Sequence, residues 1–212
     1  MSEDTVFALS SPVGGAIAIV RITGSGAYAA LGRVFRCKNA PEHRVMNYGH
    51  VIDPESGETI DSAMACFLEA PATYTGEDMA EIYIHGSRVI AKRTLSVLSR
   101  FLRPAEGGEF TKRAFMNGKL DLSQAEAVMD VISSVTEQGA RMAEEQLAGS
   151  IGSGIKDIED RLIDILSGVE AALDYPEELE EDTVSALGSE LAPIIDCLLY
   201  TSPSPRDMRR SR

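Results

Sequence analysis

The sequence predicts an α+β domain followed by a segment that is entirely helical. In the first half of the chain, short runs rich in β-branched residues alternate with turns that contain Gly and Pro. After Leu122 no further run of this kind is evident. From Ile151 to Leu173, apolar residues recur at spacings of four and three, which is the pattern of an amphipathic helix.

Five strands and two helices are predicted in the first part of the chain. The strands cover residues 6–9, 16–22, 48–52, 60–68 and 80–84. Turn-forming residues separate the strands, as in the Pro- and Gly-containing segment 53–57. Helical periodicity predicts one helix over 27–35, after a glycine-containing break, and a second over 89–102.

Three helices are predicted in the second part, and a fourth begins near its end. The first opens at a capping box, Ser123–Glu126. The second, which is either a separate helix or a bent continuation of the first, carries Ala140, Ala143 and Leu147 on one face. The third runs from Ile151 to Leu173. The acidic segment 174–182, where Pro176 stops this helix, is predicted to be a solvated linker, and 184–195 to start another helix. The apolar faces indicate a bundle core rather than a cofactor site.

Composition and charge argue against several classes of function. The chain has 212 residues, of which 44% are hydrophobic, and a formal net charge of −13. It can therefore bury a core, but it offers little positive charge to nucleic acid, so an RNA contact would have to be local or supplied by a partner. The three cysteines form no CxxC pair and no cluster with metal-ligand spacing. We expect no metal site, no membrane span, no signal peptide and a reducing cytosol.

Three charged residues are hard to explain as surface positions alone. Arg21 and Glu81 interrupt apolar, strand-like runs, and Lys119 ends a charged segment that contains two phenylalanines. Each of them either faces solvent or binds a ligand, and their spacing does not decide whether they converge. His85, which precedes Gly86, is either structural, the commoner case, or a general base. The sequence assigns no catalytic residue.

Two motifs of phosphate-binding loops are present only in part. The segment 24–29 fits G-x-G-x-x-A, but alternating strands and helices do not follow it, so we interpret it as an ordinary turn. The segment 117–119 looks like the end of a P-loop. Leu120 stands where Ser or Thr would hold magnesium, and no complete G-x-x-x-x-G-K-[ST] occurs in the sequence. We therefore predict that this chain has no GTP or ATP site.

The segment 197–212 differs from the rest of the sequence. It changes abruptly to Ser, Pro and Arg after an acidic stretch. It is either a basic tail that binds RNA or an unrelated sequence, and we favour the second interpretation. It is therefore excluded from the predicted fold.

Several segments occur in an order that resembles the tRNA modification GTPases of the MnmE, or TrmE, family. The most specific is Gly108–Glu126, which reads GEFTKRAFMNGKLDLSQAE. The supporting segments are Ala16–Gly24, Thr75–Asp78, His85–Gly86 and Leu173–Glu178. Gly107 departs from the pattern, because the family usually has Pro at this position. Gly restricts the unfolded chain less than Pro does, so the backbone before the motif is less constrained. The resemblance extends from the start of the chain to about Asp196.

The resemblance implies a domain organisation and a function. Residues 1–119 would form a folate-binding, dimerising α+β domain similar to aminomethyltransferases, and 120–196 a truncated helical domain. The implied cofactor is 5-formyltetrahydrofolate, held by Arg21, Glu81 and Lys119; GTP, magnesium and potassium belong to the full-length family. The family works in the bacterial cytoplasm with a flavin-containing partner, MnmG or GidA, on carbon 5 of the wobble uridine of tRNA.

Two alternatives to this function remain open at this point. The chain could be a stand-alone folate-dependent aminomethyltransferase, which would act on its substrate without a partner. It could also be a non-catalytic interaction module whose helices form a docking surface and whose folate pocket is unused.

Overall fold

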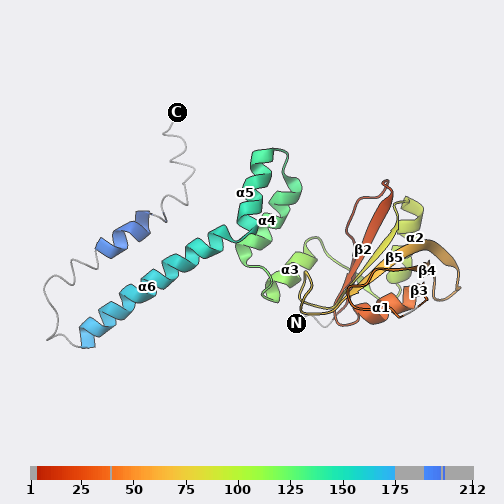
Figure 1. Cartoon of the computed structure of the whole chain (residues 1–212), viewed down its shortest axis with the longest axis horizontal. Helices are drawn as coiled ribbons and strands as arrows, with labels where there is room; N and C mark the ends of the chain where they lie inside the picture. Colours follow the sequence, from red (N-terminus) through yellow and green to blue (C-terminus); the bar gives the residue numbers. More distant parts are fainter. Residues whose placement is uncertain (1–3, 39, 175–188, 197, 199–212) are drawn as a thin grey trace. The chain divides into compact units, whose positions relative to one another are not determined.

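The chain folds as two compact units, Met1–Leu147 and Ala148–Arg212 (Figure 1). The computed structural model describes residues 4–38, 40–174, 189–196 and 198. Three predicted segments lie wholly or largely outside the described residues: the linker 174–182 except Asp174, the start of the last helix at 184–188, and nearly all of the segment 197–212.

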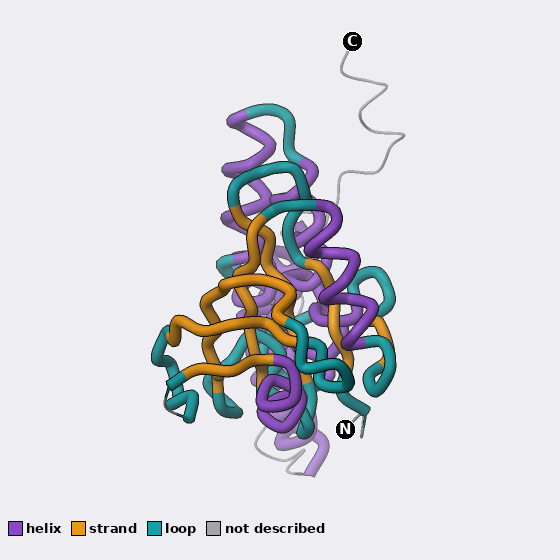
Figure 2. Tube along the Cα trace, turned by 90° about the vertical axis from the view of Figure 1, so that its right-hand side faces the viewer, coloured by secondary structure: helices purple, strands orange, loops and turns teal. Residues whose placement is uncertain are grey.

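A seven-stranded sheet forms the frame of the first unit, with the strand order β3-β4-β5-β6-β2-β1-β7. Its neighbouring strands, orange in Figure 2, are antiparallel except for β1 and β7, which run parallel. The strands are β1 (Val6–Leu9), β2 (Ile17–Thr23), β3 (Phe35–Cys37), β4 (Asn47–Ile52), β5 (Thr59–Leu68), β6 (Met79–His85) and β7 (Arg103–Pro104).

The five predicted strands are confirmed to within one residue at each end. The prediction missed β3 and β7, which have three and two residues and are too short to show alternation. Both lie at the edges of the sheet, where these residues become a strand because their backbone forms hydrogen bonds with one neighbouring strand.

The core lies on one face of the sheet, beneath the helices α1 (Ala27–Val34) and α2 (Arg88–Leu98). On β2, Ala18, Val20 and Ile22 are fully buried in this core, because alternate residues of a strand face the same side. Leu31 and Leu98 pack against them from the two helices. The sheet thus has one covered face and one open face.

The predicted end of α2 was four residues too late. The helix ends at Leu98, and the backbone N–H groups of Arg100 and Phe101 donate to carbonyls only three residues back. Such bonds tighten the last turn of a helix. The chain can then enter β7, which the sequence pattern did not reveal.

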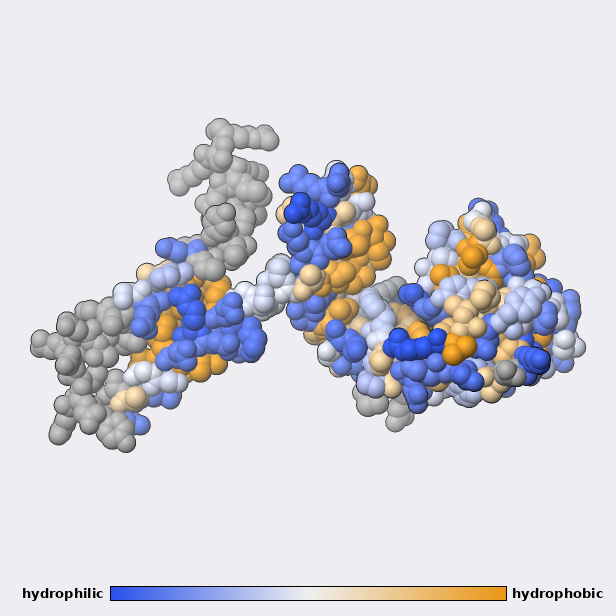
Figure 3. Space-filling view, in the orientation of Figure 1, coloured by the Kyte–Doolittle hydropathy of each residue, from blue (hydrophilic) through white to orange (hydrophobic). Residues whose placement is uncertain are grey.

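Three helices complete the first unit: α3 (Glu109–Met116), α4 (Leu122–Ser133) and α5 (Glu137–Leu147). The sequence did not predict α3, since two of its inward positions are Arg113 and Ala114 rather than large apolar residues. The helices α4 and α5 form a hairpin, whose exposed Met and Ile side chains contribute to its orange surface in Figure 3.

The predicted capping box was placed two residues too late. Asp121 is the N-cap of α4: its side chain accepts a hydrogen bond from the Gln124 backbone at 2.8 Å, and the Gln124 side chain accepts one from the Asp121 backbone at 2.9 Å. Ser123 lies inside the first turn and donates to the Asp121 carboxylate instead. Asp is as good an N-cap as Ser, so sequence spacing alone did not choose between the two boxes.

The second unit contains the long helix α6 (Ser150–Asp174) and a helical segment at 189–196. The predicted third helix is thereby confirmed. Several of its apolar side chains are exposed, among them Ile155, Leu166 and Leu173. No helix among the described residues combines the length and the hydrophobicity needed to cross a membrane.

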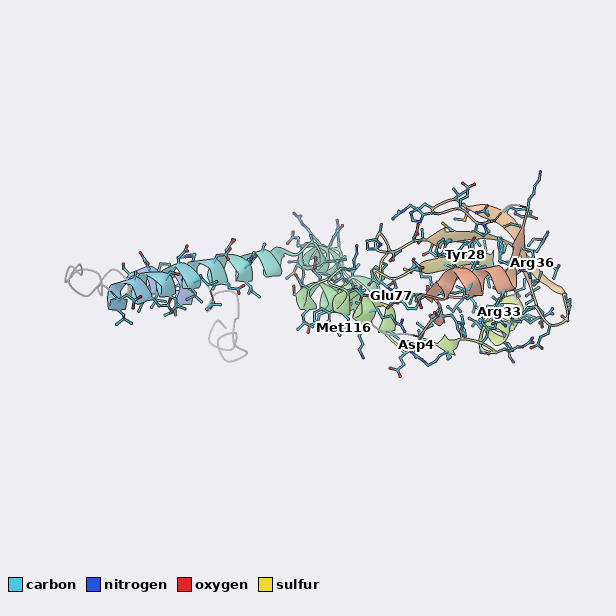
Figure 4. The ribbon with its side chains drawn as sticks, turned by 90° about the horizontal axis from the view of Figure 1, so that it is seen from below. Asp4, Tyr28, Arg33, Arg36, Glu77 and Met116 are labelled. Carbon is cyan, nitrogen blue, oxygen red and sulfur yellow. The ribbon has the colours of Figure 1, made fainter. Side chains whose placement is uncertain are left out.

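A buried guanidinium fixes α3 against the N-terminal segment and the loop before β6. Arg113 is only 5% exposed, and its terminal nitrogens lie 2.8 Å from Asp4, 2.8 Å from Glu109 and 3.0 Å from Glu77. Two of these partners, Asp4 and Glu77, are labelled in Figure 4. Arg103 binds the Glu109 carboxylate with two parallel hydrogen bonds of 2.7 and 3.0 Å. Ion pairs this dense compensate for the removal of Arg113 from water.

The Glu109 carboxylate should make stability depend on pH in the acidic range. The hydrogen bonds from Arg103 and then Arg113 lower its pKa from 4.5 to about 2. Stability gained from a lowered pKa is present above the unfolded pKa and is lost as pH falls toward the folded one. We expect Glu109→Gln to reduce the free energy of unfolding most near neutral pH, and progressively less between about pH 4.5 and pH 2.

Urea unfolding of both proteins across this pH range measures the difference. Glu106→Gln, the same substitution at an exposed side chain three residues earlier, serves as the control and should change little. A Glu109→Gln effect that is equally large at pH 7 and pH 3 would contradict the role assigned to the carboxylate charge.

Candidate functional site

Two of the three predicted site residues meet on the open face of the sheet. The antiparallel register of β2 and β6 places Arg21 directly opposite Glu81. The Arg21 Nε atom lies 2.7 Å from Oε1 of Glu81, and the Glu81 side chain is 13% exposed. Directly opposed residues of opposite charge are close enough to pair, so the register itself forms this contact.

A tyrosine takes the other oxygen of Glu81. The Tyr83 hydroxyl donates to Oε2 of Glu81, two residues away on the same face of β6. Burial, followed by the hydrogen bond to Glu81, raises the pKa of Tyr83 to about 12. The hydroxyl therefore keeps its proton at neutral pH and remains a donor. Both carboxylate oxygens of Glu81 are thus held by neighbouring side chains.

Arg21 also lines a cavity of about 580 Å³ between β1 and the helices α3 and α4. Its walls are formed by residues 106–111 together with apolar and aromatic residues from other segments, including Tyr74, Met129 and Ile132. Arg21 uses Nε toward Glu81, so its terminal nitrogens are the donors that remain for a ligand. Mostly apolar walls with a few polar groups are typical of sites that bind small molecules.

Lys119 is placed elsewhere, beside the loop that connects β5 to β6. Its ammonium donates to the carbonyl of Pro71 at 3.2 Å, and it does not line the cavity beside Arg21. Its aliphatic stem crosses Gly76, where a Cβ would lie 3.2 Å from Cγ of Lys119. Gly76 has a φ of +77°, a conformation that glycine adopts without strain. The structure therefore brings Arg21 and Glu81 together and leaves Lys119 one loop away.

The same loop connects Lys119 with the cavity. Tyr74 lines the cavity, and its hydroxyl lies 2.9 Å from Oγ1 of Thr111 on α3. Asn117, two residues before Lys119, donates to the carbonyl of Thr75 at 2.7 Å. A small movement of this loop would therefore move Lys119 and the wall of the cavity together.

His85 is held by a carboxylate at the end of β6. Its Nδ1 lies 2.8 Å from Asp61, and its backbone N–H donates to the same carboxylate at 2.7 Å. The Asp61 side chain is almost fully buried, whereas the imidazole is exposed. This contact fixes the orientation of the His85 ring at the end of the strand.

Sequence reasoning missed Tyr83, Tyr74 and Asp61. Alternation along β6 could have revealed Tyr83, because residues two apart in a strand share a face and Glu81 was already a candidate. No local pattern marks Tyr74 or Asp61, since their partners come from distant segments. Within the described part of the chain, no group of three or more His, Cys, Asp or Glu could hold a metal ion.

Comparisons with known proteins match both parts of the chain. Residues 5–119 match the family model described as the N-terminus of the GTP-binding protein TrmE, and residues 122–208 match the model of the MnmE helical domain. The curated tRNA modification GTPase MnmE of Lactobacillus delbrueckii subsp. bulgaricus is 40% identical over 215 residues, covering 97% of this chain and 46% of that protein.

Other similar relatives carry the same name. The protein of Pediococcus pentosaceus is 43% identical over 187 residues, covering 86% of this chain and 40% of the relative. That of Carboxydothermus hydrogenoformans is 40% identical over 204 residues, covering 92% and 44%. The chain thus spans less than half the length of these relatives. The match over nearly the whole chain places it in the family of the tRNA modification GTPase MnmE, of which it contains the N-terminal and helical domains.

Proposed function

We propose that this chain is the folate-binding and self-associating part of a tRNA modification GTPase. The proposal depends on Arg21, which lines the cavity, and on its ion pair with Glu81, which lies beside Arg21 on β6 but is not itself among the residues that line the cavity. The parent protein would hydrolyse GTP and, with a flavin-containing partner of the MnmG type, modify carbon 5 of the tRNA wobble uridine. The domain division at 119/120 remains part of the same proposal. So does the unrelated origin of the segment 197–212, although the match to the helical-domain model extends to residue 208.

The residues of the site suit a reduced folate such as 5-formyltetrahydrofolate. A pterin presents a ring N–H beside an amino group, and a carboxylate accepts such a pair of donors. Glu81 already accepts from Arg21 and Tyr83, but a carboxylate has about four acceptor positions, so others remain. The terminal nitrogens of Arg21 would meet carbonyl or carboxylate oxygens of the ligand. Lys119 would join them if the loop before β6 moves toward the cavity.

Titration with 5-formyltetrahydrofolate tests the site directly. Replacing one charged partner of a largely buried, hydrogen-bonded site costs about 2 kcal/mol or more, which is roughly thirtyfold in Kd. We expect Glu81→Ala to weaken binding by at least this factor and Lys119→Ala to weaken it less, by calorimetry. Glu42→Ala, at an exposed side chain, is the control. Folate binding by Glu81→Ala as tight as by the wild type would reject the assignment.

The same titration separates the three functions considered for this chain. Binding without turnover favours the proposal made here. Transfer of a one-carbon group to an acceptor without a partner would instead favour a stand-alone aminomethyltransferase. An absence of folate binding would favour a non-catalytic interaction module.

The chain should not hydrolyse GTP, because its sequence contains no complete P-loop motif. We expect purified protein to release phosphate from GTP no faster than a buffer blank, in a colorimetric assay with an intact P-loop GTPase as the positive control. Release that rises in proportion to the concentration of this chain would contradict the proposal.

Self-association through the first unit is proposed to use the open face of the sheet. Ile17, Tyr48 and Met64 are 60%, 67% and 44% exposed, and they line a shallow, mostly apolar groove with Tyr83. Exposed apolar side chains gathered on one face commonly mark a contact with another protein surface. A second copy of the chain can cover the same face in a symmetric dimer.

Light scattering coupled to size-exclusion chromatography tests this surface. We expect the wild type to elute with the mass of two chains and Met64→Glu to shift to one, because a charge would be buried in the interface. The matched control is Met116→Glu, which makes the same change at an exposed methionine on α3. A dimer that survives Met64→Glu but not Met116→Glu would place the interface elsewhere.

A further inference from the structure

We propose that Tyr83 sets the ligand specificity of the folate site by holding the carboxylate of Glu81 in the orientation that accepts two adjacent N–H donors. This inference rests on the folate site proposed above and assigns to it a residue that does not itself need to touch the ligand. Tyr83 is thus a positioning residue, and it selects ligands with a 2-amino-4-oxopyrimidine edge.

The hydrogen bonds of Glu81 define its orientation. Oε1 accepts from Arg21 on the neighbouring strand, and Oε2 accepts from Tyr83 on the same strand. Two donors that approach from different directions fix the plane of a carboxylate, whereas a single donor leaves it free to rotate. The acceptor positions that remain on the two oxygens then point in fixed directions.

Tyr83 is itself held in place by its neighbours in the sheet. It lies opposite Ile19 on β2 and opposite Met64 on β5, all on the open face. Its side chain is only partly exposed. The pKa of Tyr83, raised to about 12 chiefly by burial, keeps the hydroxyl a donor at every pH at which the protein would bind its ligand.

The positions of the hydrogen-bond donors on a ligand decide whether the ligand fits the oriented carboxylate. Because Glu81 is acceptor-only when ionised, the oriented carboxylate favours an edge with two neighbouring donors, such as the ring N–H and amino group of a pterin. A ligand without the amino group leaves one acceptor position unpaired. Sites built around hydrogen bonds reject such analogues strongly, since a buried polar group then lacks a partner.

Two ligands and one near-isosteric substitution test the inference. Binding of 5-formyltetrahydrofolate and of its 2-desamino analogue is measured for the wild type and for Tyr83→Phe, which removes a single oxygen. We expect the wild type to prefer the natural folate by about tenfold or more. Tyr83→Phe should lose about tenfold in affinity for the natural folate but bind the analogue nearly as the wild type does. The discrimination, rather than overall affinity, is the diagnostic readout.

The control is Tyr28→Phe, which removes a hydroxyl from an exposed tyrosine on α1, outside both the folate site and the groove proposed for self-association. It should leave both affinities unchanged. Circular dichroism confirms that each variant is folded. A Tyr83→Phe protein that keeps the wild-type discrimination, or that loses both ligands equally, overturns the role of Tyr83 while the folate site stands. A wild type that binds neither ligand overturns the proposed function and this inference with it.

Discussion

The antiparallel register between β2 and β6 is the constraint on which the rest of the first unit depends. It buries Ala18, Val20 and Ile22 on one face and sets Arg21 opposite Glu81 on the other. Because the side-chain period of a strand is two, a slip of one residue would turn the apolar set outward and bury the charged pair. Burial of the apolar residues therefore also determines which two charged residues face each other across the strands.

The second constraint is the burial of Arg113. A guanidinium that is withdrawn from water is tolerated only when several acceptors surround it, and here Asp4, Glu77 and Glu109 converge on it from three segments. The network fixes α3, and through α3 it fixes the Glu106–Thr111 segment that lines the cavity beside Arg21. Within the motif 108–126, Glu109 and Arg113 therefore hold the fold together, whereas Lys119 is the charge predicted for the candidate site.

The helices differ from the sheet in how their apolar residues are used. In the α4–α5 hairpin, the Gln124 side chain donates to the carbonyl of Leu147 and the Gln146 side chain to that of Ser123, so polar contacts join the two helices. Yet Met129, Ile132 and much of the apolar stripe of α6 are exposed. Apolar stripes of this kind are what a bundle normally buries. The chain covers less than half the length of its relatives, which contain further sequence that could cover such surfaces.

The sequence by itself determined the order of the main elements, the change from α+β to helical structure, and the family. Period-two alternation and helical periodicity are local, so they are visible in one chain without any fold. The family followed from a long motif, Gly108–Glu126, whose residues are specific in combination. Comparison with known proteins confirmed both the family and the fold class.

Only the tertiary structure decided which charged residues meet. Arg21 and Glu81 lie 60 residues apart and become neighbours through strand pairing, whereas Lys119 binds the carbonyl of Pro71. The tertiary structure also places Tyr83 beside Glu81 as a second hydrogen-bond partner, and it places three carboxylates around Arg113. Such contacts depend on the register between strands. They also depend on which buried polar side chains need hydrogen-bond partners once water is removed. The spacing of residues along the chain reveals neither.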